Sequence, residues 1–133
     1  MKSAVNKFLL LLSIITVSAN TQAQTPSFTS QQICRATIAA VMGRNPSIIK
    51  LEGVTGDQIN VFYIRSDDGS RWRNRCKIQG PNIVWATSEG RWRNSPEDEV
   101  ITYSASSSSI TIKIKYADGS KAEKSYTSAQ LGK

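Results

Sequence analysis

Histidine is absent from this chain of 133 residues. Its absence removes the most common general base at neutral pH, the most common zinc ligand, and every catalytic arrangement that pairs serine or cysteine with histidine. The remaining route to an enzyme is carboxylate chemistry, either a glycosidase-like pair or acidic ligands for a divalent cation. The composition therefore favours a binding protein over an enzyme.

The acidic residues that could support such chemistry are Glu52 and two short clusters, Asp67-Asp68 and Glu97-Asp98-Glu99. Adjacent side chains on a strand point to opposite faces, so neither cluster forms a converging pair through its spacing alone. Both clusters adjoin turn residues, where acids are common. We expect no catalytic residue, cofactor or metal. A small carboxylate-dependent hydrolase is the third alternative, and it requires two carboxylates in one pocket, one with a raised pKa.

Long apolar runs are also scarce. The run at residues 8–17 is about ten residues long, follows Lys2 and Lys7, and precedes the small-residue site Thr21-Gln22-Ala23. It is shorter than the ~20 apolar residues that span a bilayer, and no later segment approaches that length. These features predict a signal peptide at 1–23 and a single globular domain at 24–133, periplasmic or secreted, without a membrane span. The alternative is an N-terminal membrane anchor.

Cysteine is limited to Cys34 and Cys76. The chain has no C-x-x-C motif, which argues against a redox-active thiol. Because an exported protein with an even cysteine count is expected to pair them, we predict one disulfide, closing a loop of about 43 residues and contributing roughly 4 kcal/mol.

Helical periodicity occurs once, over roughly residues 29 to 43. Thr29 and Gln32 have capping-box spacing, Cys34 lies on the apolar stripe, and Gly43 stands where a helix would end. Short β-rich runs separated by turns follow, at 48–54, 59–65, 71–78, 83–87, 99–104, 110–116 and 121–126. Such short connections force antiparallel neighbours. We predict an α+β fold, with one helix on a bent antiparallel meander of six or seven strands.

The tetrapeptide Arg-Trp-Arg-Asn occurs twice, at 71–74 and 91–94, each time after an acidic residue and a glycine. If both copies are strands, their arginines share one sheet face and Trp72 and Trp92 point the other way, with Cys76 and Ile78 beside Trp72. Arginine suits bidentate recognition of phosphate, sulfate or carboxylate. The candidate anion-binding residues are Arg71, Arg73, Arg75, Arg91 and Arg93. The alternative is a solvated face whose arginines pair with acids across strands.

Trp72 and Trp92 are expected in the core, with an exposed aromatic platform of Trp72, Trp85 and Trp92 as the alternative. The strand of Trp85 is apolar on both faces, so the sequence does not assign this ring to one side. Basic residues interleaved with aromatics also occur in single-strand binders, but export and the lack of a nucleic-acid motif disfavour that partner.

The predicted mature chain carries about +5 net charge, which favours an anionic partner. Our leading hypothesis is a non-enzymatic binding protein for an anionic envelope component or acidic protein. The second is an inhibitor or immunity protein that binds a secreted toxin or hydrolase. The sequence leaves open the oligomeric state, the partner's identity and the choice between periplasm and medium.

Overall fold

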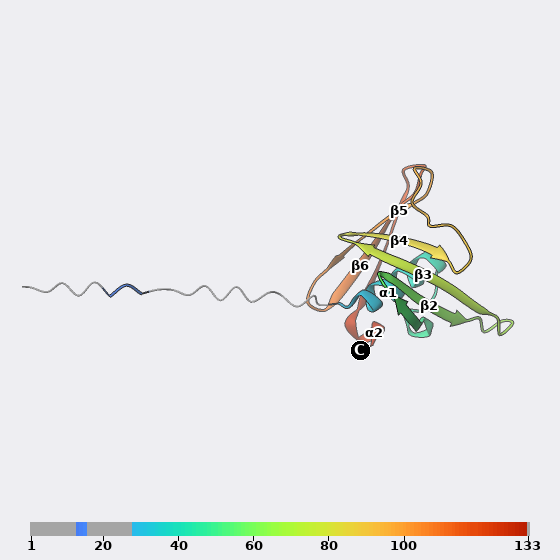
Figure 1. Ribbon diagram of the computed structural model, residues 1–133, viewed down its shortest axis with the longest axis horizontal. Coiled ribbons are helices and arrows are strands. Elements are labelled where there is room, and N and C mark those ends of the chain that lie inside the picture. Colours follow the sequence, from blue (N-terminus) through green and yellow to red (C-terminus); the bar gives the residue numbers. More distant parts are fainter. Residues whose placement is uncertain (1–12, 16–27, 133) are drawn as a thin grey trace, which may run out of the picture.

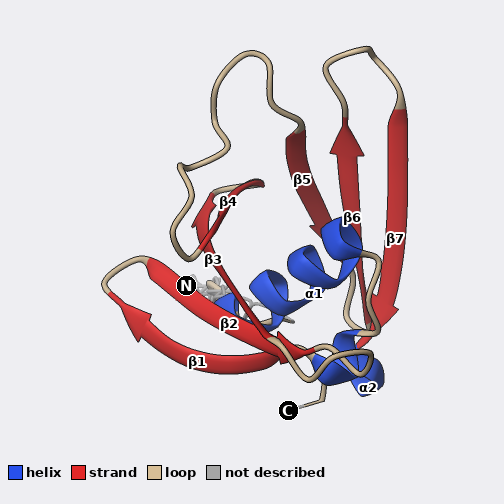
Figure 2. Ribbon diagram, turned by 90° about the vertical axis from the view of Figure 1, so that its right-hand side faces the viewer, coloured by secondary structure: helices blue, strands red, loops and turns tan. Residues whose placement is uncertain are grey.

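The computed structural model describes residues 13–15 and 28–132, so the predicted signal peptide lies outside the described residues except for 13–15. One antiparallel sheet of seven strands, in chain order, bends around a single long helix (Figures 1 and 2). This confirms the predicted α+β meander. The elements are α1 (Ser30–Met42), the 3-10 turn η1 (Pro46–Ile48), β1 (Lys50–Thr55), β2 (Gln58–Ile64), β3 (Arg71–Gln79), β4 (Asn82–Thr87), β5 (Val100–Ala105), β6 (Ser109–Lys115), β7 (Lys121–Thr127) and α2 (Ser128–Leu131).

Helix α1 begins and ends at the predicted capping residues. The Thr29 hydroxyl accepts from the Gln32 N–H, and the Gln32 side chain accepts from the Thr29 N–H. At the other end Gly43 adopts φ 64°, the left-handed conformation that glycine tolerates without strain. The helix therefore follows from its local sequence.

The core lies between α1 and the concave face of the sheet. Ile38 of α1 and Val61 and Tyr63 of β2 are almost fully buried there. The predicted disulfide is present: Cys34 of α1 and Cys76 of β3 have a Cα–Cα separation of 5.8 Å. Both half-cystines are buried, and their bond joins the helix covalently to the middle of the sheet.

The sheet consists of two arms, β1–β4 and β5–β7, which are joined at a narrow seam. Between β4 and β5 only two residue pairs form, Asn82 with Thr102 and Ile83 with Ile101. Figure 2 shows that β1–β3 and β5–β7 stand at a steep angle to each other, with α1 between them. The loop at 88–99 leaves β4 and returns to β5 where these two strands diverge. We call the two pairs the β4–β5 seam.

Where η1 and α2 meet α1, the side chain of Arg35 of α1 connects these elements. Its guanidinium donates hydrogen bonds to the backbone carbonyls of Pro46, Ile49 and Leu131. Burial lowers the pKa of Arg35 because desolvation disfavours its charge. Among the described residues, no helix is long and apolar enough to span a membrane.

Candidate anion-binding face of the sheet

The first Arg-Trp-Arg-Asn copy opens strand β3, and its side chains alternate as predicted. Asn74 and Cys76 face α1 and are buried. The opposite side of β3, on the convex face of the sheet, carries four cations in succession, at two-residue intervals of roughly 6.6 Å. We call these four residues the β3 cationic row; they are Arg71, Arg73, Arg75 and Lys77.

Three of these cations are held against aromatic rings. The Arg71 guanidinium lies 3.7 Å from the ring centroid of Phe62, on neighbouring β2. The Arg75 guanidinium and the Lys77 ammonium lie 4.4 Å and 4.5 Å from the centroid of Trp92. A cation over a ring is oriented by the ring's quadrupole but keeps its full charge.

The contacts of the β3 cationic row differ in whether they neutralise the charge of each side chain. Arg73 forms an ion pair with Glu52 of β1 at 3.1 Å. Arg75 donates from Nε to the Thr87 carbonyl and from Nη2 to the Gly90 carbonyl, neither of which neutralises it. Within residues 28–132, no carboxylate forms an ion pair with Arg71, Arg75 or Lys77. The row thus presents uncompensated positive charge.

The second copy of the tetrapeptide is not a strand, so the prediction of two equivalent strands is wrong for residues 91–94. These residues lie in the 88–99 loop between β4 and β5. The physical reason is local, because three acids lie shortly after the second copy and two of them bind its guanidiniums. The five predicted arginines therefore do not share one face.

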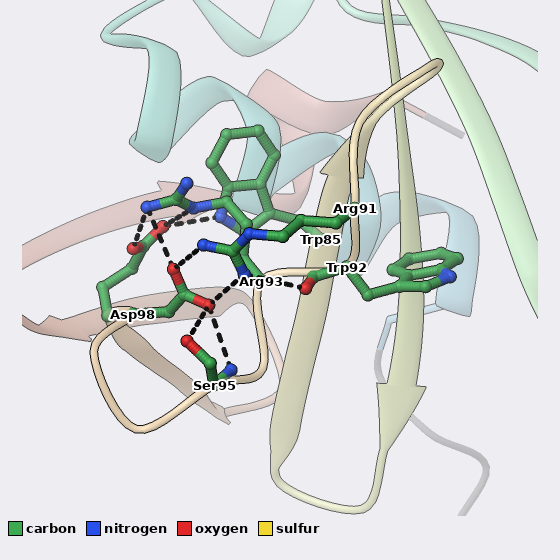
Figure 3. A network of polar contacts seen from close by, with 7 residues as sticks. Trp85, Arg91, Trp92, Arg93, Ser95 and Asp98 are labelled. Atoms are coloured by element: carbon green, nitrogen blue, oxygen red, sulfur yellow. Dashed lines mark hydrogen bonds and ion pairs between the residues drawn. The ribbon is translucent and has the colours of Figure 1, made fainter.

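A compact ion-pair network holds this loop (Figure 3). Arg91 donates to both carboxylate oxygens of Asp98, at 2.7 and 2.8 Å, and Arg93 donates to both oxygens of Glu99, at 2.9 and 2.8 Å. Such bidentate pairs are among the stronger side-chain contacts. We call these four residues the acid clasp. Arg91 and Arg93, which were predicted to bind an external anion, thus bind two carboxylates of their own loop.

Further hydrogen bonds complete the acid clasp. Asp98, whose side chain is only 4% exposed, also accepts from the backbone N–H and the hydroxyl of Ser95. Glu99 accepts from the Trp85 indole N–H at 2.8 Å. The guanidinium hydrogen bonds hold the pKa of both carboxyl groups below their ordinary values, Asp98 through Arg91 and Glu99 through Arg93.

The tryptophans occupy three different environments. Trp85, whose side the sequence left open, is 8% exposed and belongs to the core. Trp72 points to the same side as Cys76 but is 41% exposed, because it lies next to the turn of the β2–β3 hairpin, opposite Tyr63; its prediction as a core residue is wrong. Trp92 is only half-buried and lies outside the core, so its prediction as a core residue is also wrong. It extends from the loop away from the acid clasp (Figure 3) and packs on Arg75 and Lys77. The two copies therefore meet, although they differ in structure.

Two residues of this face were not among the predicted site residues. Lys77 continues the alternation of the arginines on the same strand, so the sequence contained its signal. Phe62 could be placed only from the register of β2 with β3, where it stands opposite Arg73. That register depends on how the hairpin closes and on which face is buried, which the alternation of one strand does not fix.

Two carboxyl groups elsewhere, those of Asp68 and Asp118, accept hydrogen bonds within local turns. Ser70 hydrogen bonds lower the pKa of Asp68, and Ser120 hydrogen bonds lower that of Asp118. The hydrolase alternative needs a carboxyl with a raised pKa, the opposite direction. In the described part of the chain, no group of three or more His, Cys, Asp or Glu residues is placed to hold a metal ion.

Comparison with known proteins supplies no relative for this face. No family model, curated protein or solved structure matches the chain. Its function is therefore inferred from its own side chains.

Proposed function

We propose that this chain is a small exported binding protein, without enzymatic activity, whose β3 cationic row binds an anionic partner. The observation that carries the proposal is the placement of Arg71, Arg75 and Lys77 over aromatic rings instead of beside carboxylates. A surface that needed only solvation has no requirement for this arrangement. An anion-binding surface gains from it, because the cations are oriented before the partner arrives and lose less conformational freedom on binding.

The distribution of charge supports the same proposal. The seven strands contain nine lysines and arginines but only two acids, Glu52 and Glu123. The other eight acids lie in turns and loops. Because opposite charges are separated in this way, the strands carry a net charge of +7. Such a surface attracts an anionic partner over a range limited by salt, about 8 Å at physiological ionic strength.

The proposed location agrees with the covalent structure. The Cys34–Cys76 disulfide is buried and joins two elements of the core. Structural disulfides persist in the periplasm and outside the cell, where the environment is oxidising. We therefore place the binding function in the cell envelope or the medium, where phosphate- and carboxylate-bearing polymers and acidic proteins are available partners.

Binding of long-chain inorganic polyphosphate by the oxidised protein tests the proposal. The double variant Arg71→Gln, Lys77→Gln removes two row cations that donate no side-chain hydrogen bond within the described chain. We expect weaker binding and a slope of log K against log salt that is less steep by about 1.4. Titration at four salt concentrations measures both quantities.

The matched control is Arg44→Gln, Lys124→Gln. It removes the same charge, and Arg44 also lies over an aromatic ring, that of Tyr63 at 5.5 Å. Both residues border a hollow beside α1, away from the convex face. Equal losses in the two double variants would overturn the proposal, because binding would then depend on net charge alone. In a pull-down from envelope and secreted fractions, one stoichiometric protein retained equally by both variants would instead support the inhibitor hypothesis.

A further inference from the structure

We infer that the partner is a linear polyanion that crosses the convex face from the β3 cationic row to a second row of cations on β6 and β7. This second row consists of Lys113, Lys115 and Lys121. The inference rests on the proposed function and extends it, because it assigns the chemical class of the partner and a second set of binding residues.

The register of the sheet shows that the two rows share a face. Gln79, two residues after Lys77 on β3, pairs with Asn82 on β4. Asn82 pairs with Thr102 on β5, and Thr102 pairs with Lys113 on β6. Directly paired residues of antiparallel strands project to the same side. Lys113 therefore lies on the same side of the sheet as Lys77, opposite α1.

The second row surrounds an open hollow. Lys115 pairs with Lys121 across β6 and β7, so two ammonium groups stand side by side. The hollow has a volume of about 330 Å³, and the three lysines share its lining with Val100, Thr102 and one acid, Glu123, which stands opposite Lys113 across β6 and β7. The lining therefore keeps a net charge of +2. All three lysines are exposed, and none forms an ion pair with another described residue. Like charges this close favour an anion that lies between them.

The separation of the rows indicates a polymer. From β3 to β6 there are three interstrand steps, roughly 14 Å along the sheet. One phosphate or carboxylate group cannot contact both rows over that span. A chain of repeating anionic groups can occupy both, and the second contact then forms at a high effective concentration.

The curvature of the sheet distinguishes a polymer from an acidic protein. Strands β1–β3 of the first arm and β5–β7 of the second stand at a steep angle, and the convex face follows that bend (Figure 2). A rigid, flat protein surface that contacts the arginines of β3 cannot also reach the lysines of β6, because the sheet bends away from it. A flexible linear chain can follow the bend across the β4–β5 seam. The geometry therefore favours the polymer.

The test uses the triple variant Lys113→Gln, Lys115→Gln, Lys121→Gln, with the charge-conserving triple Lys→Arg variant as its control. The probes are long-chain polyphosphate and tripolyphosphate. For the long chain we expect the salt slope to become less steep by about 2 in the Gln variant and to stay unchanged in the Arg variant. The affinity advantage of the long chain over tripolyphosphate should decrease at least tenfold in the Gln variant, because only one row remains.

Two outcomes would overturn this inference. In the first, the Gln triple variant keeps the wild-type slope while Arg71→Gln, Lys77→Gln loses affinity; the second row is then not a site, although the proposed function stands. In the second, an acidic protein binds the β3 row and long-chain polyphosphate does not compete with it. Failure of the β3 variant itself to weaken binding contradicts the proposed function separately.

Discussion

The two copies of Arg-Trp-Arg-Asn show how neighbours decide what an arginine does. In the first copy, on β3, the nearest partners of Arg71 and Arg75 are aromatic rings and backbone carbonyls, which leave the charge in place. In the second copy, Arg91 and Arg93 each bind a carboxylate through two hydrogen bonds. The same tetrapeptide therefore exposes cations to a partner on β3, whereas in the 88–99 loop its arginines form ion pairs that hold the loop together.

The asparagines that end the two copies also differ, because one is buried and the other is exposed. Asn74 is 2% exposed, and its side-chain oxygen and nitrogen have no hydrogen-bond partner among the described residues. Asn94 is exposed in the loop. A buried amide without a partner costs free energy, so the position of Asn74 follows from the alternation of β3 and not from a favourable contact of its own.

Removal of the disulfide should have the largest effect, because it releases the strand that carries the first copy. We expect Cys34→Ser, Cys76→Ser to lower the free energy of unfolding by about 2–5 kcal/mol. Denaturant unfolding monitored by tryptophan fluorescence measures this change, with reduced wild-type protein as the comparison. A double variant as stable as the oxidised protein would show that packing alone fixes β3 against α1.

Breaking the acid clasp should have a smaller effect, centred on the second copy. Asp98→Asn removes the charge that Arg91 binds, so we expect a lower unfolding temperature and faster proteolysis within 88–99. Polyphosphate binding by the β3 row should persist. The matched control is Glu97→Gln, a neighbouring exposed acid that forms no ion pair with the described residues.

The stability contributed by the Asp98 carboxylate should depend on pH in a defined direction. The pKa of Asp98 is lower in the folded protein than in the unfolded chain, so its contribution to stability is complete above the unfolded pKa of about 4. That contribution decreases as the pH falls from there through the folded pKa. The difference in unfolding temperature between wild type and Asp98→Asn should therefore shrink below about pH 4. A constant difference would contradict a role for the charge.

The smallest predicted effect is at the contact where the copies meet. A double-mutant cycle with Arg75→Gln and Trp92→Leu should give a coupling of about 0.5–1 kcal/mol, as expected for a partly exposed cation–π pair. The control cycle combines Arg71→Gln with Trp92→Leu, because Arg71 lies over Phe62. Coupling in both cycles would indicate a general rearrangement of the convex face.

Much of the fold was predictable because its signals are local. The Thr29 and Gln32 spacing identified the start of α1, and short turns predicted the meander. The side of each half-cystine followed from two periodicities, helical around Cys34 and alternating around Cys76. Each of these inferences needed only a few neighbouring residues, so tertiary context did not override them.

The candidate site was less predictable because it depends on which residues meet. Nothing in Arg91-Trp92-Arg93-Asn94 distinguishes it from the first copy, and the difference lies in the segment on its C-terminal side. A proline at position 96 and the acids at 97–99 were the available signals of a loop with its own counterions. Pairing of arginines with acids was an alternative from the sequence, but the expected pairing was across strands, whereas the second copy pairs within one loop.

The narrow β4–β5 seam affects which arm of the sheet unfolds first. The disulfide joins α1 to β3, so the helix and the first arm remain covalently connected whatever happens beyond β4. The arm of β5–β7 has no disulfide. It is held by the two residue pairs of the seam, by the acid clasp, by packing on α1 and by the hydrogen bonds from Arg35 and Gln32 of α1 to the carbonyls of Leu131 and Gly132, which follow β7. Local unfolding proceeds through the segments with the fewest such restraints. We therefore expect the second arm to open more readily than the first, with the seam as the boundary between them. Native-state hydrogen exchange that is faster at the amides of β5–β7 than at those of β2 and β3 would confirm this order.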